Sequence, residues 1–307
     1  MEKYKLDLNQ QIEQLEKLGI KFEKYSKKEA YDFLRNNNYL FKIKSYSKNY
    51  DINLKSNQYI NLDFSYLVEL STLDMYLRRI ILNIGLNIEH LLKVELNAEL
   101  SQNNKEDGYS IVKEFLLSNL KFQCEIDNKA ERESFVRKLL VKNKDHLPYW
   151  ILIEVLDFGS FLNFYQFYFN KYPNRYYNNH YTLGYCVRIL RNGAAHNNCI
   201  LNTIKIPYTN KFNPKKNLQT TIAKIGSVSK NTRGKILNDP IFHDILATVV
   251  LFNQICNSKS MKKATFNEII KFLKRCKKHK QYFQNNNLIS SKFKAIVKII
   301  LGLKKVI

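Results

Sequence analysis

Apolar side chains recur at helical spacing through one long segment, and this feature restricts the fold more than any other. The apolar residues that define it are Leu67, Leu70, Leu73, Leu77, Ile80, Ile81, Ile84, Ile88, Leu91 and Val94. Asp63 precedes the segment, where a short acidic side chain typically caps the first turn of a helix. The pattern therefore predicts a helix over about 64–100. Asp74 and Arg78, four residues apart, are predicted to pair on its surface.

The rest of the chain also favours helices. Only 9 glycines and 5 prolines occur in 307 residues, so few positions suit the tight turns of a β-rich fold. Residues 39–60 fit either a loop or a short hairpin, and residues 201–235, with Pro207, are predicted to be loop-like. Residues 150–169 are almost continuously apolar or aromatic, which is typical of a segment buried on most sides. Further helices are predicted near 10–18, 27–35, 110–120, 129–142, 180–191, 240–257, 264–280 and 289–305, and the fold class is predicted to be all-α.

Positive charge is concentrated toward the C-terminus. Residues 201–307 carry 22 of the 50 lysines and arginines but only three acidic residues, out of a net charge of +23. A segment this basic attracts a polyanion, and RNA, DNA and anionic lipid all qualify. The last helix mixes lysine with isoleucine and leucine, so an anionic membrane surface is its alternative partner. We expect the densest basic cluster to bind RNA phosphates: Lys271, Lys274, Arg275, Lys277, Lys278 and Lys280.

The five cysteines give no sign of a metal site or of disulfide bonds. No two of them form a C-x-x-C pair and their number is odd, so free thiols in a reducing cytosol are the simpler interpretation. The N-terminus lacks the apolar region of a signal peptide, and no apolar stretch of about 18 residues occurs. We therefore expect a cytoplasmic protein without a cofactor, a metal or a membrane partner.

The segment from Arg191 to His196, with the sequence RNGAAH, is the one constellation with a clear chemical meaning. RNA cleavage without metal needs a base for the 2′-hydroxyl, an acid for the leaving 5′-oxygen and a cation for the phosphate. Histidine titrates near neutrality and serves as base or acid. Arginine stays charged and binds phosphate with two parallel donors. Asn192 would hydrogen-bond the phosphate or orient His196, so Arg191, Asn192 and His196 are the predicted catalytic residues.

Helical spacing supports this site in part. Asn192 and His196 are four residues apart and would share a helix face. Arg191 would lie about 140° round a regular helix from His196, and we expect the backbone to deviate at Gly193 and bring the arginine round. One histidine supplies one proton-transfer group, so a symmetric dimer that apposes two segments would complete the site. The alternative is a chance match in which Arg191 and His196 are structural.

Three blocks of sequence resemble one known family. They are residues 73–79 (LDMYLRR) continuing to 88–90, residues 147–160 (LPYWILIEVLDFGS) and residues 188–197 (RILRNGAAHN). Their content and order resemble the Abi-like family of bacterial abortive-infection proteins, of the AbiD/AbiF kind, within the HEPN superfamily. The family commonly has cysteine before the histidine, where this chain has Ala195. Residues after about 210 are less typical of the family, so their predicted role depends on charge alone.

The resemblance implies a HEPN-like helical bundle and a composite RNase site across a homodimer, with 2′,3′-cyclic phosphate products. It also implies phage defence, and some family members resemble toxins that a cognate non-coding RNA holds in check. The expected organisation is an N-terminal helical segment (1–60), a HEPN-like domain with the R-x4-H motif (61–205) and a basic helical region (206–307). The alternative functions are an RNA-binding protein that sequesters a specific RNA without cutting it, and a membrane-acting effector.

Within this resemblance, Glu89 is a candidate to orient Arg191 or His196 through its carboxylate. The alternative is a solvated or lysine-paired glutamate, and His90 beside it is expected to be an ordinary helix residue.

Two groups of aromatic residues are candidates for base stacking. In the apolar run, a core or dimer-interface role is favoured over stacking because the spacing covers all sides of a helix. This group is Trp150, Phe158, Phe161, Phe164, Tyr165, Phe167 and Tyr168. In the second group, contact with single-stranded RNA and a plain solvated loop stay equally open. It consists of Tyr39, Tyr46 and Tyr50 interleaved with Lys42, Lys44 and Lys48.

Overall fold

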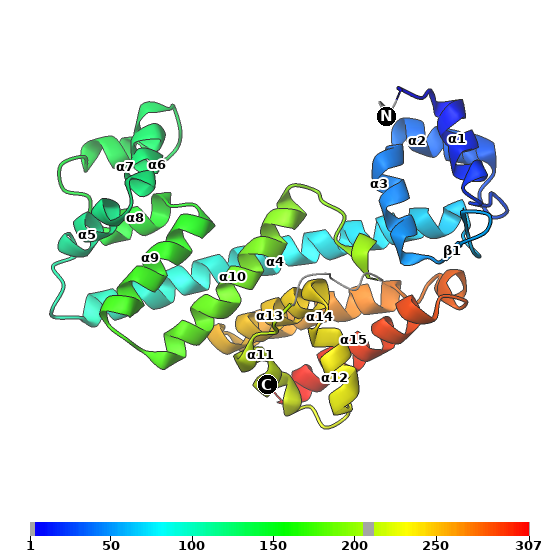
Figure 1. Cartoon of the computed structure of the whole chain (residues 1–307). Coiled ribbons are helices and arrows are strands. Elements are labelled where there is room, and N and C mark those ends of the chain that lie inside the picture. The colour runs from blue at the N-terminus through cyan, green and yellow to red at the C-terminus, as the bar shows by residue number, and fades with distance from the viewer. Residues whose placement is uncertain (1–3, 205–211, 307) are drawn as a thin grey trace. The chain divides into compact units, whose positions relative to one another are not determined.

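The computed structural model describes residues 4–204 and 212–306, and the regular secondary structure of this part is almost all helical (Figure 1). It contains fifteen α-helices and one two-stranded sheet, which confirms the predicted all-α class. The chain divides into two compact units. Unit 1 comprises residues 1–83, 190–246 and 258–307, and unit 2 comprises residues 84–189 and 247–257. Three helices contribute to both units: α4 (Phe64–Gln102), α10 (Arg175–Ala195) and α13 (Pro240–Ile255).

The N-terminal part of unit 1 is built from helices with complete caps. The Asp7 side chain accepts a hydrogen bond from the Gln10 backbone amide at the start of α1, and the Gln10 side chain accepts one from the Asp7 backbone amide. Ser26 and Glu29 form the same reciprocal arrangement at the start of α2, as their spacing predicts. The elements of this part are α1 (Leu8–Lys17), α2 (Lys27–Asn36), α3 (Leu40–Ser45), η1 (Tyr46–Asn49), β1 (Ile52–Asn53) and β2 (Gln58–Tyr59).

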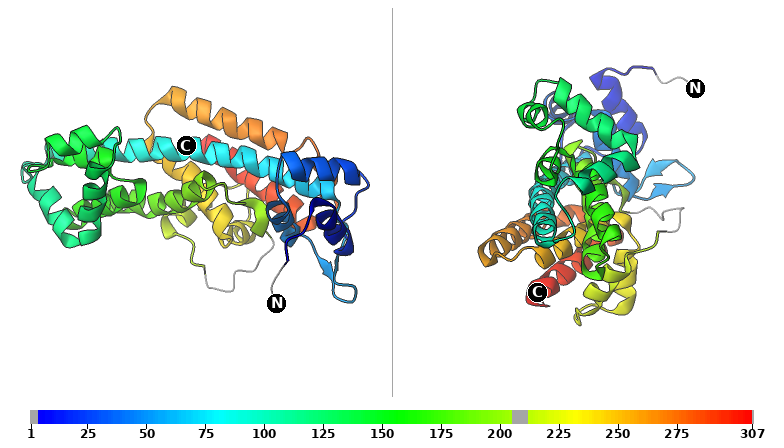
Figure 2. Two further views of the ribbon diagram at one scale, coloured as in Figure 1. Left: turned by 90° about the horizontal axis from the view of Figure 1, so that it is seen from above. Right: turned by 90° about the vertical axis from the view of Figure 1, so that its left-hand side faces the viewer.

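Residues 39–60, left open between loop and hairpin, contain both a helix and a hairpin. The chain forms α3 and η1 first, and β1 then pairs with β2 in the antiparallel hairpin visible in Figure 2 (right, pale blue). Asp63 follows, and its carboxylate accepts from the Ser65 amide at 2.9 Å and from the Glu23 amide at 2.9 Å. The predicted cap of α4 is therefore confirmed, and the same carboxylate also ties the preceding loop to the helix.

The C-terminal part of unit 1 packs against the first half of α4. In Figure 2 (left), α14 runs alongside this half of α4. The prediction that residues 201–235 are loop-like is wrong, because two short helices form there; Pro207 lies outside the described residues. The Ser229 hydroxyl, which accepts from the Thr232 amide, starts the second of them. The elements are η2 (Leu201–Thr203), α11 (Lys216–Ala223), α12 (Lys230–Leu237), α14 (Lys259–Arg275), η3 (Lys280–Phe283) and α15 (Asn287–Val306).

Unit 2 has a core rich in aromatic side chains. The apolar run predicted over 150–169 forms two helices, because Asp157 leaves the helical conformation and caps α9 through the Ser160 amide. Trp150 is 46% exposed, but most of the run is buried, which confirms the core interpretation. The helices that belong to this unit alone are α5 (Ser110–Ser118), α6 (Leu120–Glu131), α7 (Arg137–Lys142), α8 (Tyr149–Val155) and α9 (Phe158–Lys171).

Among the described helices, none combines the length and the apolarity that a membrane crossing requires.

Candidate active site at the end of α10

The predicted catalytic segment lies at the C-terminal end of α10, within unit 1. The helix continues through Ala195, and His196 caps it, with its amide donating to the Asn192 carbonyl at 2.9 Å. Asn197 then adopts the left-handed conformation (φ 58°), and the Asn198 amide donates to the Gly193 carbonyl at 2.9 Å. This pattern is a Schellman cap with asparagine at the position that glycine usually fills. The histidine therefore stands where a regular helix stops.

The three candidate side chains differ in exposure. His196 is exposed, whereas Arg191 and Asn192 are half-buried. The Arg191 Nη1 donates to the Asn192 Oδ1 at 3.1 Å, so the guanidinium and the amide are held together before any ligand arrives. Helical spacing places Asn192 and His196 on one face, as expected. The segment thus presents a proton-transfer group one turn after Asn192, whose side chain is hydrogen-bonded to Arg191.

The predicted backbone deviation at Gly193 is wrong. Residues 191–195 form regular α-helix, and Gly193 does not have a positive φ. A Cβ added at Gly193 would meet nothing within 4 Å, so close packing does not explain this glycine either. Arg191 therefore keeps the angular separation from His196 that a regular helix dictates, about 140°. For Arg191 and His196 to act on the same phosphate, a second copy of the segment or a bridging RNA strand would be required.

The opposite face of this helix end is anchored in a hydrophobic cluster. Leu190 and Ala194 are buried against Leu77 and Ile81 of α4, and Ile200 completes the cluster. The burial of positions 190 and 194, four residues apart, directs the intervening polar side chains away from the core. The apolar stripe of α4 thus sets the orientation of the candidate site.

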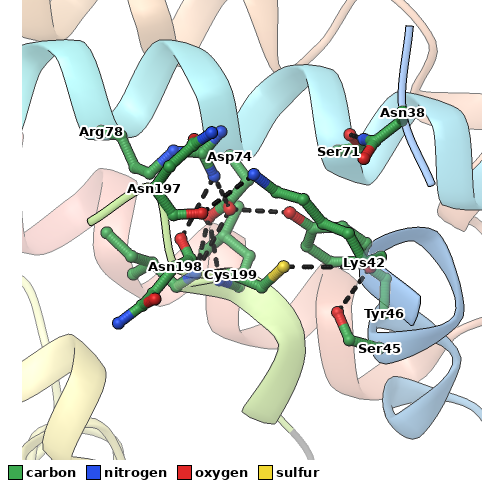
Figure 3. Close-up of polar contacts among 12 residues, drawn as sticks. Asn38, Lys42, Ser45, Tyr46, Ser71, Asp74, Arg78, Asn197, Asn198 and Cys199 are labelled. Atoms are coloured by element: carbon green, nitrogen blue, oxygen red, sulfur yellow. Dashed lines mark hydrogen bonds and ion pairs between the residues drawn. The ribbon is translucent and has the colours of Figure 1, made fainter. Parts of the chain in front are cut away.

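A buried carboxylate fixes the chain immediately after the histidine. Asp74 of α4 is fully buried (0% exposed), and its Oδ1 accepts from the Leu201 amide at 2.9 Å and from the Ile200 amide at 3.1 Å (Figure 3). The Tyr46 hydroxyl donates to its Oδ2 at 2.7 Å. Arg78, one turn further along α4, forms the ion pair with the same carboxylate. One side chain therefore joins α4, η1 and the segment that follows the motif.

Two cations hold the carbonyls of the same segment. Arg78 also donates to the Asn198 carbonyl at 3.3 Å, and the Lys42 Nζ donates to the Asn197 carbonyl at 2.9 Å (Figure 3). Lys42 is only 6% exposed, and burial together with the Arg78 charge lowers its pKa. Burial raises the pKa of the Asp74 carboxyl, although Tyr46 and Arg78 oppose that shift by stabilising the charged form. The helix end carrying His196 is consequently fixed from both its amide and its carbonyl side.

This network corrects two predictions. Asp74 and Arg78 do pair, but the pair is buried and not on the surface of α4. Tyr46 and Tyr50 are core residues (0% and 4% exposed), so they fit neither RNA contact nor a solvated loop, whereas Tyr39 is 60% exposed. The sequence did contain a signal for Asp74, because the residue falls on the same apolar stripe as Leu70 and Leu77. A charge in such a stripe indicates a buried partner.

The predicted basic cluster, which runs from the end of α14 to the start of η3, divides into two groups. Its five lysines are exposed: Lys271 and Lys274 on α14, Lys277 and Lys278 in the turn after it, and Lys280 at the start of η3. Arg275 is half-buried and forms two hydrogen bonds with Glu69 of α4, at 2.5 and 2.9 Å. Arg275 therefore connects α14 to α4, and the lysines carry the charge that faces solvent.

Glu89 belongs to unit 2, where its carboxylate pairs with Lys93 at 3.5 Å. A lysine-paired glutamate is one of the alternatives that the sequence allowed. A role in orienting Arg191 or His196 stays a prediction. His90 is an exposed helix residue.

The residues of the candidate site suit proton transfer and phosphate binding more than metal binding. Within residues 191–196, His196 is the one side chain of a type that commonly ligates metals, and the segment contains no carboxylate. The fold and the site together define the class: an all-α protein with an R-x4-H motif at a fixed helix end. The profile of the family described as Abi-like protein matches residues 32–202, more than half of the chain, so the protein belongs to that family. The match includes the motif and the Asp74 network.

Membership of the family indicates an abortive-infection function, and the expected placement in the HEPN superfamily is consistent with it. Comparison with curated proteins and with solved structures gave no match.

Proposed function

We propose that this protein is a metal-independent endoribonuclease of a bacterial abortive-infection system. The observation that carries the proposal is the exposed His196 at the cap of α10, beside the joined Arg191 and Asn192 side chains. Histidine is suited to proton transfer at neutral pH, and arginine to an anionic phosphate. The fixed helix end supports this role, because proton transfer needs a group held within hydrogen-bond reach of its target.

In the proposed reaction, a base removes the proton of the 2′-hydroxyl and the 2′-oxygen attacks the adjacent phosphorus. The bond from phosphorus to the 5′-oxygen breaks, and an acid protonates that oxygen. The products are a 2′,3′-cyclic phosphate and a 5′-hydroxyl. His196 performs one proton transfer, the partner subunit's His196 performs the other in a homodimer, and Arg191 with Asn192 binds the phosphate.

Substrate RNA is proposed to reach this site through the basic surface that runs from the end of α14 to η3. Its exposed lysines attract phosphates, and such contacts give affinity without sequence preference. Arg275 is occupied by Glu69, so we assign it to the fold of this surface and the phosphate contacts to the lysines. The proposed RNA is the substrate, or a structured non-coding RNA that regulates the protein.

The deciding experiment is cleavage of end-labelled RNA in EDTA by protein stripped of copurifying RNA. We expect wild type to leave cyclic phosphate ends and His196→Ala to retain RNA binding while losing at least about 100-fold in rate. The exposed His90 offers the matched control, and His90→Ala should cut like wild type.

The other outcomes separate the alternatives. If wild type and His196→Ala bind RNA equally and neither cuts, the protein is an RNA-sequestering module. Equal cleavage by both would place the active site elsewhere, and loss of cleavage in EDTA would contradict a metal-independent mechanism.

A further inference from the structure

A groove of about 440 Å³ lies between α4 and α14 in unit 1, away from the residues of the motif. α4 contributes Tyr76, Arg79, Ile80 and Asn83 to its walls, and α14 contributes Glu268, Lys271, Phe272 and Arg275. Sites for small organic ligands typically measure roughly 300–1,000 Å³. The groove is therefore large enough for a nucleotide.

Two aromatic side chains, Tyr76 and Phe272, line the groove. Tyr76 is 39% exposed, and the Arg275 guanidinium lies 5.9 Å from its ring centre. Arg275 cannot turn away from the ring without losing both hydrogen bonds to the buried Glu69. Phe272 is half-buried because it also packs on the cluster that anchors the end of α10. Tyr76 thus presents a partly accessible ring next to a guanidinium that is itself held in place, and a base needs an accessible ring for stacking.

The rim of the groove carries positive charge that the fold does not use. Arg79 and Lys271 are both exposed, and neither has a hydrogen-bond or ion-pair partner among the described residues. The one acid in the groove, Glu268, accepts a hydrogen bond from the side-chain Nδ2 of Asn83 at 3.0 Å. Lys274 extends the charge along α14, one turn beyond Lys271. An anionic ligand with a flat apolar portion fits this combination.

We propose that the groove binds one nucleotide of single-stranded RNA, with the base on Tyr76 and the flanking phosphates on Arg79 and Lys271. The proposal rests on RNA as the ligand of the proposed function, and it adds a binding subsite distinct from the R-x4-H motif. A concave site lined by aromatic side chains suits a base better than a flat bilayer. A surface that bound RNA by charge alone would not need the accessible Tyr76 ring. Stacking tolerates every base, so the subsite would give affinity with little sequence preference.

The test measures binding of a fluorescein-labelled, unstructured RNA of about 12 nucleotides, within the site sizes of single-strand binders. All variants carry His196→Ala, so that the probe stays intact. Tyr76→Ala should weaken binding by roughly 5- to 100-fold, whereas Tyr76→Phe, which keeps the ring, should bind like the parent. Because Tyr76→Ala also removes the contact with Arg275, its folding is checked by thermal denaturation.

A second variant avoids any loss of packing. The double variant Arg79→Gln with Lys271→Gln removes two charges that have no partner in the described part of the chain, so it should fold normally. The negative slope of log K against log salt should become shallower by about 1.4. The matched control is Lys113→Gln with Lys142→Gln, two exposed lysines of unit 2, which should leave the slope unchanged. Ultraviolet crosslinking of a 4-thiouridine probe should label the peptide that contains Tyr76.

Three results would overturn the proposal. Tyr76→Ala could bind RNA like the parent, or the rim pair and the control pair could change the salt slope equally. The groove variants could also lose binding to anionic phosphatidylglycerol vesicles while they keep binding to RNA. Cleavage by wild type is scored separately. If wild type cuts RNA and the groove variants bind RNA normally, the proposed nucleotide site in the groove is wrong and the ribonuclease proposal stands. If the groove variants lose binding and wild type never cuts, the subsite stands without the activity.

Discussion

Asp74 is the residue that does most to position the candidate site, although it has no contact with RNA in our proposal. Its buried carboxylate accepts from two backbone amides, a tyrosine hydroxyl and an arginine. Four donors around one buried group require an acceptor at every position. Neutral replacements of the same size therefore cannot substitute for it.

We predict that Asp74→Asn lowers the free energy of unfolding by about 3–5 kcal/mol. The side-chain NH₂ of the introduced asparagine would face other donors: the Tyr46 hydroxyl, Arg78 or the backbone amides. Arg78 would also remain buried without its counter-ion. Urea denaturation followed by circular dichroism measures the loss. The contrast is Lys27→Gln, which breaks an exposed ion pair with Glu16 and should cost less than about 1 kcal/mol. A loss for Asp74→Asn as small as this would show that the network is not required.

Cys276 gives a pH-dependent prediction at the same scale. Burial, reinforced by the Glu69 charge, raises the pKa of the Cys276 thiol from its ordinary value of 9.0 to about 12. The folded protein thus holds the thiol proton more tightly than the unfolded chain, so this group favours folding less as pH rises from about 9 toward about 12. Near pH 9, iodoacetamide should label the exposed Cys124 quickly, and Cys276 only after urea unfolding, as peptide mass spectrometry would show. Equal labelling of both in the folded protein would contradict the shift.

At the scale of the element, the important feature of α10 is how it ends. An asparagine in the left-handed conformation stops the helix directly after His196, and the following residues turn back to α4. A continued helix would carry residues 197–201 away from Asp74. The cap therefore links the local conformation of one residue to the network that fixes the site.

Two variants of Asn197 separate backbone conformation from side-chain chemistry. Asn197→Ala should lower the free energy of unfolding by about 1–2 kcal/mol, because alanine at φ 58° lacks the short polar side chain that lets asparagine hydrogen-bond locally and tolerate the left-handed conformation. Asn197→Gly removes the same amide group but accepts this conformation, so its stability should stay within about 0.5 kcal/mol of wild type. Both keep the carbonyl that accepts from Lys42. Urea midpoints measure the difference, and equal losses in the two variants would show that the side chain matters and the conformation does not.

At the scale of the whole molecule, one chain supplies one histidine in the motif, and a homodimer would supply two. We therefore predict that excess His196→Ala protein suppresses cleavage by a fixed amount of wild type, because mixed dimers lack one proton-transfer group. The same excess of His90→Ala, which keeps the motif intact, should raise cleavage instead. Sedimentation of the mixtures verifies that dimers form. A wild-type rate unaffected by His196→Ala, under conditions where mixed dimers form, would mean that one subunit is sufficient.

Much of the fold was predictable because helices depend on local order in the sequence. The spacing from Leu67 to Val94 predicted α4, and Ser26 with Glu29 predicted the start of α2. The same local approach failed for residues 201–235, where α11 and α12 are only eight residues each. Short helices carry a weak periodic signal, and their stability comes mainly from tertiary packing.

The sequence by itself determined the all-α class, the position of the R-x4-H segment on a helix and the concentration of charge on the C-terminal helices. Each depends on residue type, period and caps, which act over one or two turns. Only the tertiary structure decided that Tyr46 and Lys42 are buried around the end of α10 and that Tyr46 donates to Asp74. It also decided that Arg275 pairs with Glu69, 206 residues earlier in the chain. Burial and pairing depend on which distant segments meet, and a local pattern contains no record of that choice.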